Sequence, residues 1–289
     1  MYSKLLKYDM KAGRRTWWIV SIIISAATVI AAFLMRFCVE YIERDNRSVF
    51  PIYSTILFFV AFLYIMLIAY SMYGLLIPLF IRFYKHLYTD EGYLTFTLPA
   101  KRSTILLSKT VSVSLFSLMY FAVIAICLAL LALVVPPSEE SGQIINPVVY
   151  ETIIRIIGDL KEEGWLGWII LYLVEGVLFL AAIWFFNLVL VQFCITMGSV
   201  IAKRLKVLAS LGIYFGINTA LSVLTRLLTL CIQIFFSGGT IEVLQNLSLE
   251  RSQVLLALVL FGLIIAVITM SLTVYFATRN LLERKLNLA

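Results

Sequence analysis

The pattern of apolar and polar positions divides the chain into six long apolar runs separated by short polar connections. A bilayer core about 30 Å thick is crossed by around 20 mainly apolar residues in an α-helix. Every run meets that length, and the longer ones permit tilt or extension beyond the bilayer. The pattern therefore predicts six transmembrane helices, over residues 17–35, 52–81, 105–135, 168–197, 207–236 and 254–277.

The composition agrees with a membrane protein. Hydrophobic residues make up 62% of the 289 positions, charged residues 13%, and the mean hydropathy is +1.01. A soluble domain carries about a quarter charged residues. No connection is long enough to fold separately, so we expect one all-α transmembrane domain over residues 1–289. The first apolar run is too long for a signal peptide, whose apolar region has roughly 7–15 residues, and is expected to remain as a span.

The distribution of basic residues predicts the orientation. Sixteen of the 23 Lys and Arg residues lie in the N-terminal arm, the second and fourth connections and the C-terminal tail. The alternate connections contain most of the acidic residues. Because cytoplasmic loops are enriched in Lys and Arg, both termini are predicted to be cytoplasmic. The net charge of +7 is then a topology signal and does not indicate a nucleic-acid partner.

The cysteines give no sign of a metal site or a disulfide framework. Cys38, Cys127, Cys194 and Cys231 lie in or beside apolar runs, with no C-x-x-C pair, and His86 is the only histidine. This spacing favours free thiols.

The first sixteen residues form an amphipathic pattern. The basic side chains cluster on one side of a helical wheel, and Asp9 falls within the opposite, apolar arc. Such a helix is expected to lie at the membrane surface against lipid headgroups. The alternative is a plain basic flank that fixes topology. The apolar side consists of Tyr2, Leu5, Leu6 and Met10.

The second cytoplasmic connection, residues 82–109, combines aromatic side chains, an acidic pair, a glycine and a proline. Gly92 can end a short helix, and Pro99 prevents the residue before it from continuing one. We expect a short helix at the membrane surface that docks a cytoplasmic partner; the alternative is a simple connection. The candidate docking residues are Tyr84, His86, Tyr88, Asp90, Glu91, Gly92, Tyr93 and Pro99.

This segment resembles a family motif. The order Glu91-Gly92, Leu98-Pro99 and then Lys109 is similar to that of ABC-2 type transporter permeases. The stretches LLKYDMK and DEGYLTFTLP resemble ABC permeases of Gram-positive gut bacteria. The resemblance implies a six-span permease with an N-terminal interfacial helix and a coupling helix between spans 2 and 3.

The resemblance also implies partners. Two permease subunits would pair, as a homodimer or a heterodimer, in a bacterial plasma membrane, and each coupling helix would rest on an ABC ATPase subunit that binds ATP and Mg. The chain lacks a G-x-x-x-x-G-K-[ST] phosphate loop, so it is expected to have no enzymatic activity of its own. The implied function is export of a hydrophobic or amphipathic substrate, such as a lipid-linked molecule, an antimicrobial peptide or a drug. Lys101 departs from the family pattern, where a small polar residue usually caps the third span, so the start of that helix stays open.

Two ionisable residues interrupt the spans. Glu175 in the fourth and Arg226 in the fifth both lie roughly 15 Å from the outer membrane surface. A lone charge near the bilayer centre costs about 3 kcal/mol, so a partner or water is expected. We expect the two to form a buried pair that fixes helix register, or alternatively to contact substrate. Asn187 and Asn218 are weaker candidates that interhelical hydrogen bonds would explain.

Two other functions are compatible with a six-span protein. An ATP-independent secondary transporter or channel could use Glu175 and Arg226, although no symmetry between the two halves supports it. A rhomboid-type intramembrane protease needs G-x-S-x-G and a membrane histidine, which are absent.

Overall fold

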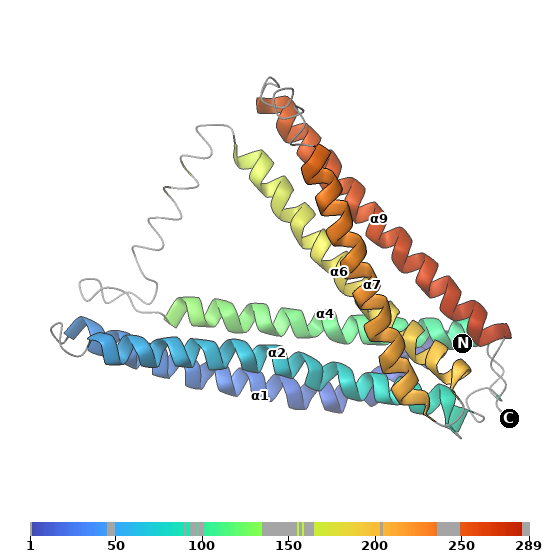
Figure 1. Cartoon of the computed structure of the whole chain (residues 1–289). Coiled ribbons are helices and arrows are strands. Elements are labelled where there is room, and N and C mark those ends of the chain that lie inside the picture. Colours follow the sequence, from blue (N-terminus) through green and yellow to red (C-terminus); the bar gives the residue numbers. More distant parts are fainter. Residues whose placement is uncertain are drawn as a thin grey trace. The chain divides into compact units, whose positions relative to one another are not determined.

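The computed structural model consists of helices throughout the part of the chain that it describes (Figure 1). It describes residues 2–44, 50–89, 91–92, 97, 101–134, 155, 158, 165–202, 205–235 and 249–284. The long helices are α1 (Tyr2–Arg44), α2 (Phe50–Tyr88), α4 (Arg102–Val134), α6 (Leu166–Ile201), α7 (Lys206–Phe235) and α9 (Leu249–Arg284).

All six helices are long and apolar enough to cross a membrane. Each contains one of the predicted apolar runs almost completely, so the expected all-α architecture with six spans is confirmed. Several helices continue well beyond the apolar run, as α2 does to Tyr88, because charged and aromatic flanks propagate a helix as readily as apolar residues do.

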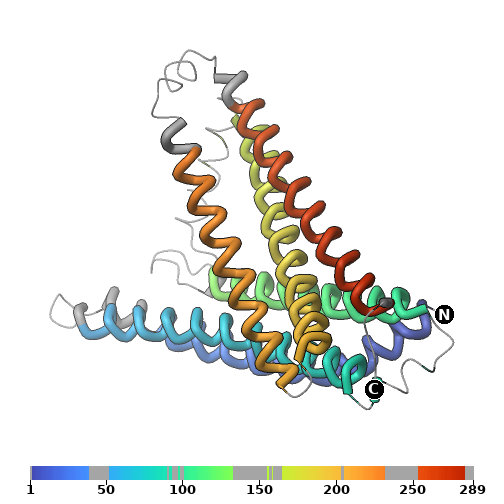
Figure 2. Tube along the Cα trace, turned by 45° about the vertical axis from the view of Figure 1, so that its right-hand side comes forward, coloured from blue at the N-terminus to red at the C-terminus, as the bar shows by residue number. Residues whose placement is uncertain are grey.

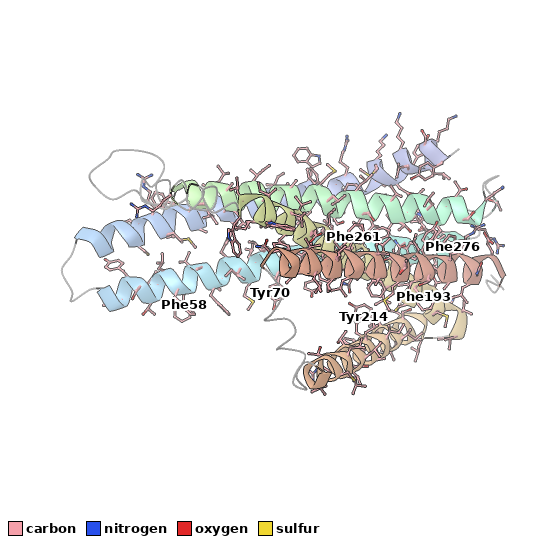
Figure 3. The ribbon with its side chains drawn as sticks, turned by 90° about the horizontal axis from the view of Figure 1, so that it is seen from above. Phe58, Tyr70, Phe193, Tyr214, Phe261 and Phe276 are labelled. Atoms are coloured by element: carbon pink, nitrogen blue, oxygen red, sulfur yellow. The ribbon has the colours of Figure 1, made fainter. Side chains whose placement is uncertain are left out.

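Large apolar side chains cover the outer faces of the helices. Phe58 and Tyr70 on α2 are 68% and 72% exposed, and Phe261 and Phe276 on α9 are 55% and 51% exposed (Figure 3). Water-soluble monomers rarely expose contiguous apolar surfaces of this extent. In lipid the same side chains need no protein cover, so the chain is a multi-pass membrane protein.

The structure divides into two compact units. The first comprises Met1–Arg82 and Val111–Gly164, and the second comprises Phe83–Thr110 and Trp165–Ala289. Two of the three boundaries, after Arg82 and before Val111, fall inside continuous helices, so α2 and α4 each contribute one part to either unit. The single transmembrane domain over residues 1–289 stays a prediction.

In the first unit, a hydroxyl pair joins α1 to α2 within the apolar interior. Tyr64 and Thr28 are both buried, and their hydroxyl oxygens lie 2.8 Å apart. Thr28 Oγ1 donates its only proton to the Ile24 carbonyl, so Tyr64 is the donor to Thr28. The surrounding cluster consists of Ala31, Ala32, Tyr64 and Leu131, with Met35, Val60 and Ile68 packed against it.

The N-terminal segment is helical as expected, but it is continuous with the first span in α1. Its five basic side chains are exposed, and the predicted apolar side is half-buried, as is Asp9. Gly13 is buried against the Phe116 ring of α4, where an added Cβ would lie 2.4 Å from the ring. This end of α1 therefore packs on protein, and a separate interfacial helix is not confirmed.

In the second unit, α6 and α7 form an antiparallel pair that is closest beside their connecting turn and separates away from it (Figure 2). Gly198 and Ser210 lie at the closest approach. A Cβ at Gly198 would lie 2.6 Å from the Ser210 backbone nitrogen. Helix α9 also packs on α6, and the Tyr172 hydroxyl of α6 donates to the Gln253 carbonyl of α9 at 2.9 Å.

Candidate functional site

The predicted cytoplasmic segment begins with the last turns of α2 and ends with the first turns of α4. Between these helices, Glu91, Gly92 and Thr97 are helical, whereas Asp90, Tyr93 and Pro99 lie outside the described residues. A Cβ at Gly92 would lie 2.8 Å from the Leu87 carbonyl oxygen, so this position requires a glycine. The separate coupling helix stays a prediction.

The start of the third span is earlier than the predicted residue 105. Helix α4 begins at Arg102, directly after Lys101. The Lys101 carbonyl accepts hydrogen bonds from the backbone N–H groups of Thr104 at 2.9 Å and Ile105 at 3.2 Å. Lys101 thus occupies the capping position without a capping side chain, and its backbone carbonyl starts the helix.

A buried polar cluster joins both ends of the segment to α6. The Tyr88 hydroxyl of α2 lies 2.6 Å from Thr196 Oγ1, which donates its own proton to the Gln192 carbonyl. Tyr88 is therefore the donor to Thr196. From α4, Thr110 Oγ1 donates to Gln192 Oε1 at 2.7 Å. Tyr88, Thr110, Gln192 and Thr196 are all buried, so we call them the α6 cluster.

Two basic side chains extend this connection to α7 and α9. Lys206 Nζ, at the start of α7, donates to the Tyr88 carbonyl at 3.4 Å. Arg102, at the start of α4, donates to the Leu282 carbonyl near the end of α9 at 3.1 Å. Both accepting carbonyls lie near the C-terminus of their helix, where unpaired carbonyls and the helix dipole favour a cation. The two ends of the segment are thereby attached to α6, α7 and α9.

The predicted docking residues that the structure describes differ in their exposure. Tyr88 is 4% exposed and belongs to the α6 cluster, so it is not an outward docking residue, and half-buried Tyr84 packs against the Tyr88 ring. Glu91 is exposed and lies 4.0 Å from half-buried His86. Lys85, which was not among the predicted docking residues, is also exposed. We call Lys85, His86 and Glu91 the docking patch.

The expected pair between Glu175 and Arg226 is not formed. Arg226 is exposed on α7, and no ion pair joins it to Glu175, which is half-buried on α6. The buried Glu175 Oε2 has no hydrogen-bond partner within the described structure. The two helices are neighbours, but they separate toward the end where both residues lie. The sequence gives the depth of each residue in the membrane, but it does not give the direction in which its side chain points from the helix.

The amide candidates are satisfied locally. The Asn187 side chain donates to the Ile183 carbonyl at 2.9 Å, and the Asn218 side chain donates to the Tyr214 carbonyl at 3.0 Å. Each bond lies within its own helix, so neither residue joins two helices through this contact.

Helix α7 has an exposed polar face that the sequence analysis did not identify. Thr219, Ser222, Arg226 and Thr229 follow one another at intervals of three or four residues, which places them on one side of the helix. All four are exposed, and the three hydroxyls donate to carbonyls of their own helix. The spacing was a readable signal for a polar stripe in an otherwise apolar span. We call these four residues the α7 stripe.

The four cysteines are free thiols, as expected. Cys38, Cys127 and Cys194 are buried and Cys231 is exposed.

In comparisons with known proteins, no family model, curated protein or solved structure matches this chain.

Proposed function

We propose that the chain is the permease subunit of an ATP-driven transporter of the ABC-2 type. It exports a hydrophobic or amphipathic substrate across a bacterial plasma membrane, paired with a second permease subunit. A separate ABC ATPase subunit binds ATP and Mg and supplies the energy. Support comes from the motif in residues 82–109 and, above all, from the α6 cluster.

The α6 cluster gives a physical reason why force on the segment would reach the spans. Tyr88 lies in the first part of the segment and Thr110 directly follows its last residue, and their partners Thr196 and Gln192 lie about one helical turn apart on α6. Breaking a buried hydrogen bond leaves a desolvated donor or acceptor, which costs about 1–3 kcal/mol. If the segment is displaced, we therefore expect α6 to move with it, because the alternative is to break these hydrogen bonds.

The docking patch supplies groups that a partner could contact. It presents Lys85 on the last turns of α2, and His86, whose imidazole lies 4.0 Å from the Glu91 carboxylate just beyond that helix. Exposed mixed charges of this kind give orientation and specificity to a contact more than affinity. A cytoplasmic ATPase subunit with a complementary groove is the proposed partner.

Crosslinking tests the docking patch. Single cysteines at Lys85 or Glu91, placed in a background lacking the native cysteines, are expected to crosslink to the proposed ABC ATPase subunit. Arg36→Cys, exposed near the opposite end of the first span, is the matched control and should not crosslink. Labelling of Lys85→Cys from outside intact cells, or ATP hydrolysis by the rigorously purified chain alone, would contradict the proposal.

The α7 stripe favours a second candidate, an ATP-independent transporter or channel. A polar face with a cation inside a span commonly lines a water-filled path. Vesicles containing only this chain distinguish the two functions. Substrate flux without an ATPase subunit, reduced by Arg226→Gln, would support the second candidate, whereas flux that requires the ATPase and ATP would support the first.

A further inference from the structure

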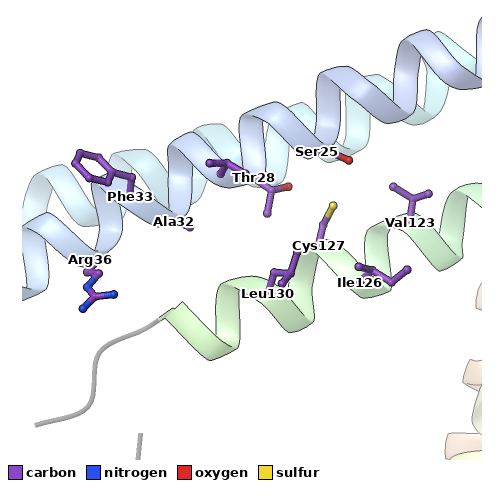
Figure 4. Close-up of a pocket in the computed structure, with 10 residues that line it drawn as sticks. Ser25, Thr28, Ala32, Phe33, Arg36, Val123, Ile126, Cys127 and Leu130 are labelled. Atoms are coloured by element: carbon purple, nitrogen blue, oxygen red, sulfur yellow. The ribbon is translucent and has the colours of Figure 1, made fainter. Parts of the chain in front are cut away.

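A groove in the first unit runs between α1 and α4. It has a volume of about 510 Å³, and its lining is almost entirely apolar (Figure 4). Ser25 and Val123 lie at one end, and Phe33 and Arg36 lie at the other. Ala32 and Cys127, both buried, form part of its floor.

The few polar groups along the groove have partners in the protein, with one exception. Ser25 donates to the Ser21 carbonyl at 2.8 Å, and Thr28 donates to the Ile24 carbonyl. Arg36 is exposed at the end of the groove, and no hydrogen bond or ion pair to the described residues occupies its guanidinium. Among the residues that the structure describes, the groove therefore offers an apolar body and, at one end, an arginine without a partner.

The length of the groove corresponds to one leaflet of a bilayer. From Ser25 to Arg36 it follows α1 for about 16 Å, half of the roughly 30 Å hydrocarbon core. Ser25 is near the middle of the predicted first span, and Arg36 follows its last residue, at the level of the lipid headgroups.

The shape of the groove suits a single hydrocarbon chain. Its volume of about 510 Å³ extends along about 16 Å of helix axis. An extended acyl chain can lie along a groove of this length.

We propose that this groove binds a membrane lipid with an anionic headgroup, its acyl chain lying between α1 and α4 and its phosphate held by Arg36. The guanidinium fits phosphate oxygens bidentately, whereas a zwitterionic headgroup adds a positive charge that weakens this attraction. Lipid binding here requires neither an ATPase nor transport, so it can fail or hold independently of the proposed function.

Native mass spectrometry of the full chain in detergent tests the site. The probes are phosphatidylglycerol and phosphatidylcholine with identical acyl chains, added separately. Wild type is expected to bind at least one phosphatidylglycerol about fivefold more tightly than phosphatidylcholine, the preference that one surface cation provides. Arg36→Gln should abolish this preference while phosphatidylcholine binding persists, and Arg36→Lys should retain most of it.

Two further variants separate the groove from the headgroup. Ile126→Trp introduces a large ring into the groove and should lower binding of both lipids. Leu118→Trp, on an exposed face of α4 outside the groove, is the matched control and should bind as wild type does.

Equal affinity of wild type for the two lipids, an Arg36→Gln variant that keeps the preference, or unchanged binding to Ile126→Trp would each overturn the proposal. So would a dimer whose formation Ile126→Trp prevents, since a second copy would then occupy the groove.

Discussion

Tyr88 and Thr196 form a directed hydrogen bond of 2.6 Å in the buried interior of the second unit. The first unit repeats this arrangement with Tyr64 and Thr28 at 2.8 Å. In both pairs the threonine donates to a carbonyl four residues earlier in its own helix, so the tyrosine of α2 is the donor between helices. Helix α2 is thus attached to one neighbour in each unit by a tyrosine.

Removing the Tyr88 hydroxyl is expected to destabilise the protein. Tyr88→Phe leaves the Thr196 oxygen buried without its donor, so the free energy of unfolding should fall by about 1–3 kcal/mol. Denaturant titration in mixed micelles measures the change. Thr225→Val, which removes an exposed hydroxyl bonded within α7, is the control and should change stability little. Equal effects of both variants would argue against a buried tyrosine hydroxyl.

Gly198→Ala is expected to disturb the α6–α7 pair. Its Cβ would meet the backbone of Ser210 at 2.6–2.7 Å, and backbone cannot rotate away as a side-chain tip can. We expect a loss of at least about 1 kcal/mol, measured by thermal unfolding. Ser210→Gly should not restore it, because the contacting backbone atoms remain. Gly212→Ala, with no atom within 4 Å, should gain up to about 1 kcal/mol from helix propensity; a loss there would contradict the exposed position of α7.

The contact between Gly13 and Phe116 tests whether the N-terminal part of α1 packs on protein. Gly13→Ala would collide with the Phe116 ring, which is buried and has little room to move. We expect a lower thermal unfolding midpoint, and partial restoration by the double variant Gly13→Ala with Phe116→Leu, whose side chain is shorter. If Gly13→Ala instead behaves as wild type, this part of α1 lies free of α4, as a surface helix would.

Glu175 and Arg226 should act independently of each other. Because they form no pair, the changes in unfolding free energy for Glu175→Leu and Arg226→Met should add to within about 0.5 kcal/mol in the double variant. Glu175→Leu alone should not destabilise, since it removes a buried oxygen that has no partner. Thr110→Val with Gln192→Leu, a hydrogen-bonded pair, is the positive control and should show larger coupling. If either substitution instead recovered the stability that the other one loses, that result would support the predicted ion pair.

The sequence by itself determined the six long apolar helices that the structure describes. A run of about 20 apolar residues must satisfy its backbone hydrogen bonds internally in lipid, so length and hydropathy suffice to predict each span. It also predicted which side of the N-terminal helix is polar, because Lys4, Lys7 and Lys11 share one face by periodicity alone. The five basic residues of that segment are all exposed in the structure.

Only the tertiary structure decided which polar side chains meet. Tyr84, His86 and Tyr88 are indistinguishable as candidates in the sequence, yet Tyr88 is buried against Thr196 while His86 lies beside Glu91. The directions in which the Glu175 and Arg226 side chains point from their helices could not be predicted from the sequence either. A span that is apolar on every side gives no signal of its rotation, since lipid and protein are equally apolar surroundings. The rotation is set by close contacts such as Gly198 on Ser210 and by hydrogen bonds such as Thr110 to Gln192, which join residues far apart in the chain.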